Sequence, residues 1–172
     1  IARSLRTAFL QAAQAIDLEA KHRAAQRYIN GTVAAAAGAA AVPIPFSSAA
    51  LLVPMQLGMM GRIAHLYQLP FDRAALLAVA SSTVATTLGR TAAANLLKFI
   101  PGAGSIAGGV INASVASGFT LAMGQAWLTV CQRSAGGKLP TTVDGVIDSA
   151  AVKHLFEEEF RKRMPNIRKQ ND

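Results

Sequence analysis

The chain has 172 residues, of which 52% are hydrophobic and 15% charged, and its formal net charge at pH 7 is +8. The charged fraction lies well below the roughly 25% of ordinary soluble proteins, which excludes intrinsic disorder and a coiled coil for the bulk of the chain. A single cysteine, Cys131, excludes a disulfide framework and a multi-cysteine zinc site. Because only 6% of the residues are aromatic, the apolar excess comes from small aliphatic side chains, which favours close helix packing over an aromatic core.

The charged residues leave two long uncharged stretches, residues 28–61 and 99–132. A membrane-spanning helix needs about 20 consecutive apolar residues. Prolines interrupt the first stretch, and Ser, Thr, Asn and Gln interrupt the second. We therefore expect buried helices of a bundle. Membrane insertion stays open as an alternative, because small residues are abundant and lipid-facing charge is absent.

The chain begins at Ile1 without an initiator methionine or a signal-peptide pattern, so we expect a fragment of a longer protein. Apolar residues at spacings of three and four predict a first amphipathic helix over residues 4–28. Asp17 with Lys21, and Glu19 with Arg23, form i,i+4 pairs of favourable order on it.

Turn residues then divide the chain into further helices. Asn30-Gly31 is expected to end the first helix, and a short Ala-rich helix over residues 33–42 is expected to follow. Pro43 and Pro45 should stop that helix, because they remove backbone donors. Ser47 or Ser48 offers an N-cap for a helix that reaches about residue 67.

The ends of the later helices are less sharply marked in the sequence. Pro54 should kink the preceding helix or mark its true start. Further helices are expected over residues 73–88 and 91–100. Residues 105–131 form either one long helix or two helices bent near Gly118.

A linker-like stretch over residues 133–140 separates this Ala/Gly-rich helical domain, residues 1–132, from an amphipathic helix over 141–164 that packs on it. Thr141 and Asp144 resemble a capping box at its start. Residues 157–159 are glutamates, each four positions before a basic residue, so the basic cluster at 161–163 is expected to pair with its own helix. Residues 165–172 form a polar tail.

Together these patterns predict an all-α fold, a compact bundle of about six to eight helices with Ala/Gly-rich hydrophobic hairpins. No stretch alternates Val, Ile and Thr as a strand would.

Catalytic and metal-binding patterns are missing from the sequence. Asp72 is the one carboxylate between residues 28 and 132, so paired carboxylates for acid–base chemistry cannot be assembled there. His22, His65 and His154 lie on three separate predicted helices, without a His or Cys at i+3 or i+4. Cys131 is expected to be a buried, inert thiol.

Nucleotide-binding patterns are missing as well. No GxxxxGK[ST] motif occurs, and the dinucleotide-like run Gly102-Ala-Gly104-Ser-Ile-Ala107 follows a helical rather than a strand pattern. We therefore expect no catalytic, cofactor-binding or metal-binding residue in this fragment.

Two proline-anchored motifs carry a resemblance to a known family over about residues 25–132. Their key residues are Pro43, Pro45, Pro54, Gln56, Pro101, Gly102, Gly104 and Gly108. In order and spacing they resemble the uncharacterised helical domain C-terminal to Era-like GTP-binding domains, which also occurs in YcjF-type inner-membrane proteins of bacteria. That family usually has an acid after the first motif, where this chain has Ser47-Ser48, so no role is carried over for it.

The resemblance implies a bacterial protein whose upstream part is a P-loop GTPase that binds GTP and Mg. The fragment itself would be a non-catalytic accessory domain that couples the GTPase to a membrane or protein partner. Its expected partners are the upstream GTPase domain and an anionic membrane surface, with no specific nucleic acid. Its expected location is cytoplasmic, with peripheral or integral attachment to the inner membrane.

Two other classes of function stay open. A membrane-inserting protein of the pore-forming type would send the hairpin around Pro43 and Pro45 into lipid. An enzyme is the least supported class, because acids and histidines are scarce. In each case Gly104, Gly108 and Gly109 are expected to let neighbouring helices approach closely.

Overall fold

A computed structural model describes residues 2–41, 47–71, 74–81, 106–141 and 147–164. Its labelled helices are α1 (Ala2–Ala41), α2 (Ser47–Leu66), α4 (Ile106–Ala135) and α5 (Ser149–Arg163), and residues 74–81 form a further short helix. The described residues contain no β-strand, only an isolated antiparallel bridge between Thr141 and Ile147. The predicted all-α fold is confirmed, with five helices in these ranges rather than six to eight.

Helix α1 shows one reason why the described ranges contain fewer helices than predicted; the helix predicted over residues 91–100 lies outside them. It runs without a break through Asn30-Gly31, where the sequence predicted an end. Ile29 and Ala36, on either side of the expected break, are completely buried, and this packing outweighs the roughly 1 kcal/mol that a glycine costs inside a helix. The Thr32 hydroxyl donates a 2.8 Å hydrogen bond to the Tyr28 carbonyl within the same helix.

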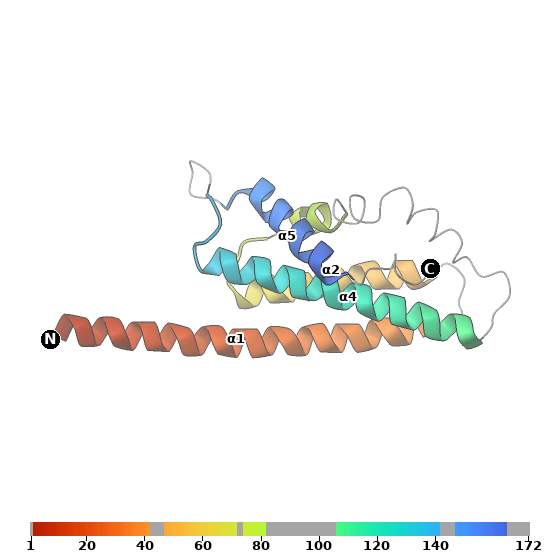
Figure 1. The fold of residues 1–172 in the computed structure, drawn as a ribbon, viewed down its shortest axis with the longest axis horizontal. Coiled ribbons are helices and arrows are strands. Elements are labelled where there is room, and N and C mark those ends of the chain that lie inside the picture. Colours follow the sequence, from red (N-terminus) through yellow and green to blue (C-terminus); the bar gives the residue numbers. More distant parts are fainter. Residues whose placement is uncertain (1, 42–46, 72–73, 82–105, 142–146, 165–172) are drawn as a thin grey trace.

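The three long helices lie side by side in the bundle (Figure 1). Helices α2 and α4 run parallel to each other and antiparallel to α1, as the figure shows. Helix α5 lies across α4 and packs against it. The N-terminal part of α1 extends beyond the ends of α2 and α4.

The core contains an aromatic cluster, which corrects the expectation of a core of small aliphatic residues. Trp127 of α4 makes edge contacts with Phe71 and Phe156, at ring-centroid distances of 5.1 and 5.9 Å. Phe160 contacts Phe119 at 5.2 Å and stacks on Phe156 at 6.1 Å. Aromatic pairs at such distances are each worth about 0.5–1.5 kcal/mol beyond the area they bury. The cluster therefore ties α5 to the bundle.

Small residues nevertheless bring the long helices close at one point. A Cβ atom at Gly124 of α4 would lie 2.9 Å from Ile29 Cγ1 and 3.1 Å from Met59 Sδ. Gly124 thus allows α1, α2 and α4 to meet. Close packing had been predicted for Gly104, Gly108 and Gly109; Gly104 and the side-chain surroundings of the other two lie outside the described residues.

Two predicted helices agree well with the structure. Helix α2 begins at Ser47, and Pro54 lies inside it, so Pro54 does not mark its start. Helix α4 is the single long helix of the two possibilities, and it passes through Gly118. It continues to Ala135 and ends in a turn in which Gly137 has a φ of 63°, so the first residues of the predicted linker are helical.

The last helix begins later than predicted. Helix α5 starts at Ser149, with Asp148 as its N-cap, and the Asp148 side chain accepts a 2.8 Å hydrogen bond from the Ala150 amide. The predicted capping residue Thr141 instead pairs with Ile147, while Asp144 lies outside the described residues. Thr141 is therefore not the N-cap of α5, which begins eight residues later at Ser149.

Candidate functional site

Polar side chains link α4 to α1 on one face. Gln26 and Gln125 exchange two amide hydrogen bonds, of 3.1 and 2.7 Å. Farther along, Gln132 Nε2 lies 3.0 Å from His22 Nδ1. These contacts fix the register of the two antiparallel helices. They account for His22 as a structural residue.

A second set of hydrogen bonds links α4 to α2. The buried Gln56 donates a 3.1 Å hydrogen bond to the Thr120 hydroxyl, and the Trp127 indole donates one of 2.8 Å to the Met60 carbonyl. Gln56, a residue of the first predicted motif, thus holds two helices together. A buried side-chain amide needs such a partner, because leaving it unpaired costs about 1–3 kcal/mol.

The basic end of α5 is paired with its own helix, as the sequence predicted. Lys162 lies 2.6 Å from Glu158 and 3.1 Å from Glu159, and Arg163 pairs with Glu159. Arg163 also donates to the Thr129 hydroxyl of α4. The hydrogen bond from Arg163 lowers the pKa of the Glu159 carboxyl. The acids therefore offset much of the positive charge on this helix end.

The remaining reactive side chains form no catalytic constellation in the described ranges. Cys131 is buried, as predicted, and burial raises the pKa of its thiol, which keeps it protonated and unreactive. Burial also raises the pKa of the Tyr67 phenol. His65 and His154 are exposed. No group of three metal-ligating side chains occurs among the described residues.

A groove with a volume of about 340 Å³ lies between α1 and α2. We call it the α1–α2 groove; its lining residues are Arg27, Tyr28, Gly31, Thr32, Ala35, Pro54, Met55, Gly58, Met59 and Arg62. A second hollow of about 360 Å³ shares Tyr28, Gly58 and Arg62 with it and extends to His65. The two hollows therefore adjoin at Tyr28, Gly58 and Arg62.

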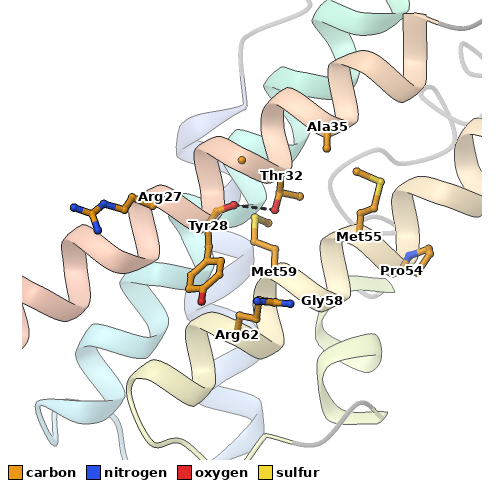
Figure 2. A pocket seen from close by; sticks show the side chains of 10 residues that line it. Arg27, Tyr28, Thr32, Ala35, Pro54, Met55, Gly58, Met59 and Arg62 are labelled. Carbon is orange, nitrogen blue, oxygen red and sulfur yellow. Dashed lines mark hydrogen bonds between the residues drawn. The ribbon is translucent and has the colours of Figure 1, made fainter.

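The side chains of the α1–α2 groove are drawn in Figure 2. Tyr28 and Thr32 of α1 face Met59 and Arg62 of α2 across it, and Arg27 extends outward at its rim. The Arg62 guanidinium carbon lies 5.3 Å from the centre of the Tyr28 ring. A cation over an aromatic face at this distance is held by about 0.5–1 kcal/mol.

Of the eight residues of the two proline-anchored motifs, only Pro54 lines the α1–α2 groove among those that the structure describes. Pro54 lines one end of it, and Gln56 packs beneath α2 against α4. Gly108 lies in α4, and the other motif residues, Pro43, Pro45, Pro101, Gly102 and Gly104, lie outside the described residues.

The sequence analysis missed the cationic residues of the groove. Neither Arg27 nor Arg62 received a role there. One signal was available: Arg62 is the first charged residue after the uncharged stretch of residues 28–61. The two arginines reach one groove because α1 pairs with α2. The sequence did not predict the register of that pairing.

No helix in the described part of the chain is long and apolar enough to cross a membrane. No family model matches the chain, and no solved structure is found to be similar to it. Among curated proteins, the chain is similar to Magnetosome membrane protein 22 of Magnetospirillum gryphiswaldense. The two sequences are 30% identical over 142 residues, which cover 80% of this chain and 69% of the relative.

Proposed function

The chain belongs to the same family as Magnetosome membrane protein 22, and on this premise we propose that it is a membrane-associated, non-catalytic helical protein that docks on an anionic membrane surface as a folded bundle. The kinship with a magnetosome membrane protein is the observation that carries the proposal. The packing and the charge of the chain support the manner of docking.

The packing supports docking without unfolding. The largest apolar side chains, among them Trp127, Phe156 and Phe160, are completely buried in a shared core. Opening the core would expose these side chains to water before they reach lipid, and burial of each contributes roughly 1.5–3 kcal/mol. The closed core therefore favours contact with the membrane through the protein surface.

The charge supports an anionic target. The chain carries a net charge of +8, and each basic residue near an anionic membrane adds about 1 kcal/mol of attraction. On α5, Glu158 and Glu159 pair with basic residues of the same helix. The face formed by α1 and α2 has Arg27 and Arg62 without such pairs among the described residues, so this face favours the membrane more.

Co-sedimentation with vesicles tests the proposal. The chain is mixed with phosphatidylcholine vesicles, with or without phosphatidylglycerol, at about 0.1 M and about 1 M salt, where the Debye length is about 10 and 3 Å. We expect binding to the anionic vesicles that falls steeply at high salt. Salt-resistant binding would indicate an inserted hairpin, and absence of binding under every condition would contradict membrane docking.

Coupling to a GTP-binding domain, which the family resemblance in the sequence implies, stays a separate prediction. Its test is the sequence upstream of Ile1. A GxxxxGK[ST] motif between a strand and a helix would support it, because that loop cradles the phosphates of a bound nucleotide.

A further inference from the structure

The α1–α2 groove has a floor of small residues. Gly31 on α1 and Gly58 on α2 line it, and a Cβ atom at either position would meet no atom within 4 Å. The space above these glycines is therefore open rather than filled by neighbouring side chains. A ligand can lie along the two helices without displacing the core.

The two ends of the groove differ in chemistry. Tyr28 and Arg62 line one end of it, where the second hollow with His65 adjoins, and Arg27 lies at the rim. Ala35, Pro54 and Met55 line the other end (Figure 2).

Val53, next to this second end in the sequence, is 48% exposed. One end therefore offers positive charge and hydrogen-bond donors, and the other offers apolar surface.

The arginines of the groove are available to a ligand. No acidic residue lines either hollow, and neither Arg27 nor Arg62 takes part in an ion pair within the described ranges. Lys21 and Arg23, one to two turns earlier on α1, are by contrast paired with Asp17 and Glu19. An anion would thus meet unneutralised guanidinium groups, which bind phosphate oxygens in a planar, two-pronged geometry.

We propose that the α1–α2 groove binds one anionic phospholipid, with the phosphate at Arg62, Arg27 adding positive charge at the rim, and the start of the acyl chains over Ala35, Pro54 and Met55. The inference rests on the proposed membrane function and names the lipid class that the surface takes. A free phosphate or a nucleic acid would use the cationic end alone. An amphiphile matches both ends at once.

Two variants test the two ends separately. Arg27→Gln combined with Arg62→Gln removes the cationic groups, and its matched control, Arg133→Gln with Lys138→Gln, removes the same charge from exposed positions outside the groove. Gly58→Leu fills the floor without changing charge. Its control is Gly118→Leu on α4, where a Cβ atom also meets nothing within 4 Å. Circular dichroism and melting temperature check that every variant folds.

The readout is partitioning of the full chain onto vesicles that contain phosphatidylglycerol, at about 0.1 M salt. At about fivefold per basic residue, the double arginine variant should bind roughly 30-fold more weakly, against a clearly smaller loss in its control. Gly58→Leu should bind several-fold more weakly, whereas Gly118→Leu should bind as the parent does. Equal losses in both charge variants, or no effect of Gly58→Leu, would overturn the proposed lipid site in the groove, while membrane docking of the bundle would still stand.

Competition identifies the source of the phosphate. A soluble short-chain phosphatidylglycerol should displace the chain from vesicles at concentrations at which inorganic phosphate, at equal ionic strength, has no effect. Equal competition by the two would show a phosphate site without a lipid site and would overturn the proposal. If the parent chain binds no vesicle at all, the proposed function itself fails, which is a different result from either of these.

Discussion

The contact at Gly124 gives the sharpest prediction about the fold. Replacing Gly124 with Ala places a Cβ atom 2.9 Å from Ile29 Cγ1 and 3.1 Å from Ile29 Cγ2. Ile29 is completely buried, and a β-branched side chain in a helix has one strongly preferred rotamer, so it cannot turn away. Met59 Sδ, at 3.1 Å, belongs to a flexible side chain and moves more easily.

The expected magnitude follows from two opposing effects. Overpacking of this kind costs about 1–3 kcal/mol, and replacement of a helical glycine by alanine returns about 1 kcal/mol. Gly118→Ala on the same helix gains the second effect without the first, because a Cβ atom there meets nothing within 4 Å. The free energy of unfolding of Gly118→Ala should therefore exceed that of Gly124→Ala by about 1–3 kcal/mol.

Urea unfolding, followed by circular dichroism and by the fluorescence of the single tryptophan, measures both variants. Ile29→Ala should cost less in the Gly124→Ala background than in the parent chain, because it removes the atoms that clash; the coupling should be about 0.5–3 kcal/mol. If Gly124→Ala were as stable as Gly118→Ala, the close approach of α1, α2 and α4 at Gly124 would be refuted.

Two further predictions concern polar contacts. The hydrogen bond from Arg163 lowers the pKa of Glu159 below its ordinary value of 4.5. The stabilisation from this pair is therefore present above pH 4.5 and is lost as the pH falls through the lowered pKa. Glu159→Gln should show a smaller loss of melting temperature on acidification than the parent chain. Single and double replacement of Gln26 and Gln125 by Ala should reveal a coupling of about 0.5–1.5 kcal/mol in urea unfolding, and strictly additive effects would argue against their paired amide hydrogen bonds.

Local patterns predicted much of the helical architecture. The expected start near Ser47 or Ser48 and the apolar spacing after it gave the bounds of α2 almost correctly, although Ser47 is the first residue of the helix. The i,i+4 pairs of α1 and the self-pairing of the α5 charges also follow from spacing alone. Such features depend on residues a few positions apart, which a sequence displays directly.

Features that depend on distant residues could not be predicted in the same way. The break expected at Asn30-Gly31 is overridden by burial of Ile29 against other helices. The aromatic cluster joins Phe71, Trp127 and residues of α5 from three separate parts of the chain.

The α1–α2 groove likewise depends on residues that are far apart in the sequence. It exists because the antiparallel register of the two helices places Tyr28 beside Arg62, and no local pattern specifies that register. Composition indicated a basic, apolar chain, but the fold was needed to place Arg27 and Arg62 beside one groove.

Quenching of Trp127 by brominated lipids tests most directly whether the chain docks on membranes as a folded bundle. Trp127 is the only tryptophan of the chain and is completely buried, and its indole donates a hydrogen bond to the Met60 carbonyl. The chain is bound to anionic vesicles whose acyl chains carry bromine, and the bound fraction is measured by co-sedimentation. We expect the bound chain to keep the emission of the free protein, because the core stays closed. Strong quenching in the bound state would show that Trp127 reaches the hydrocarbon and would contradict docking as a folded bundle.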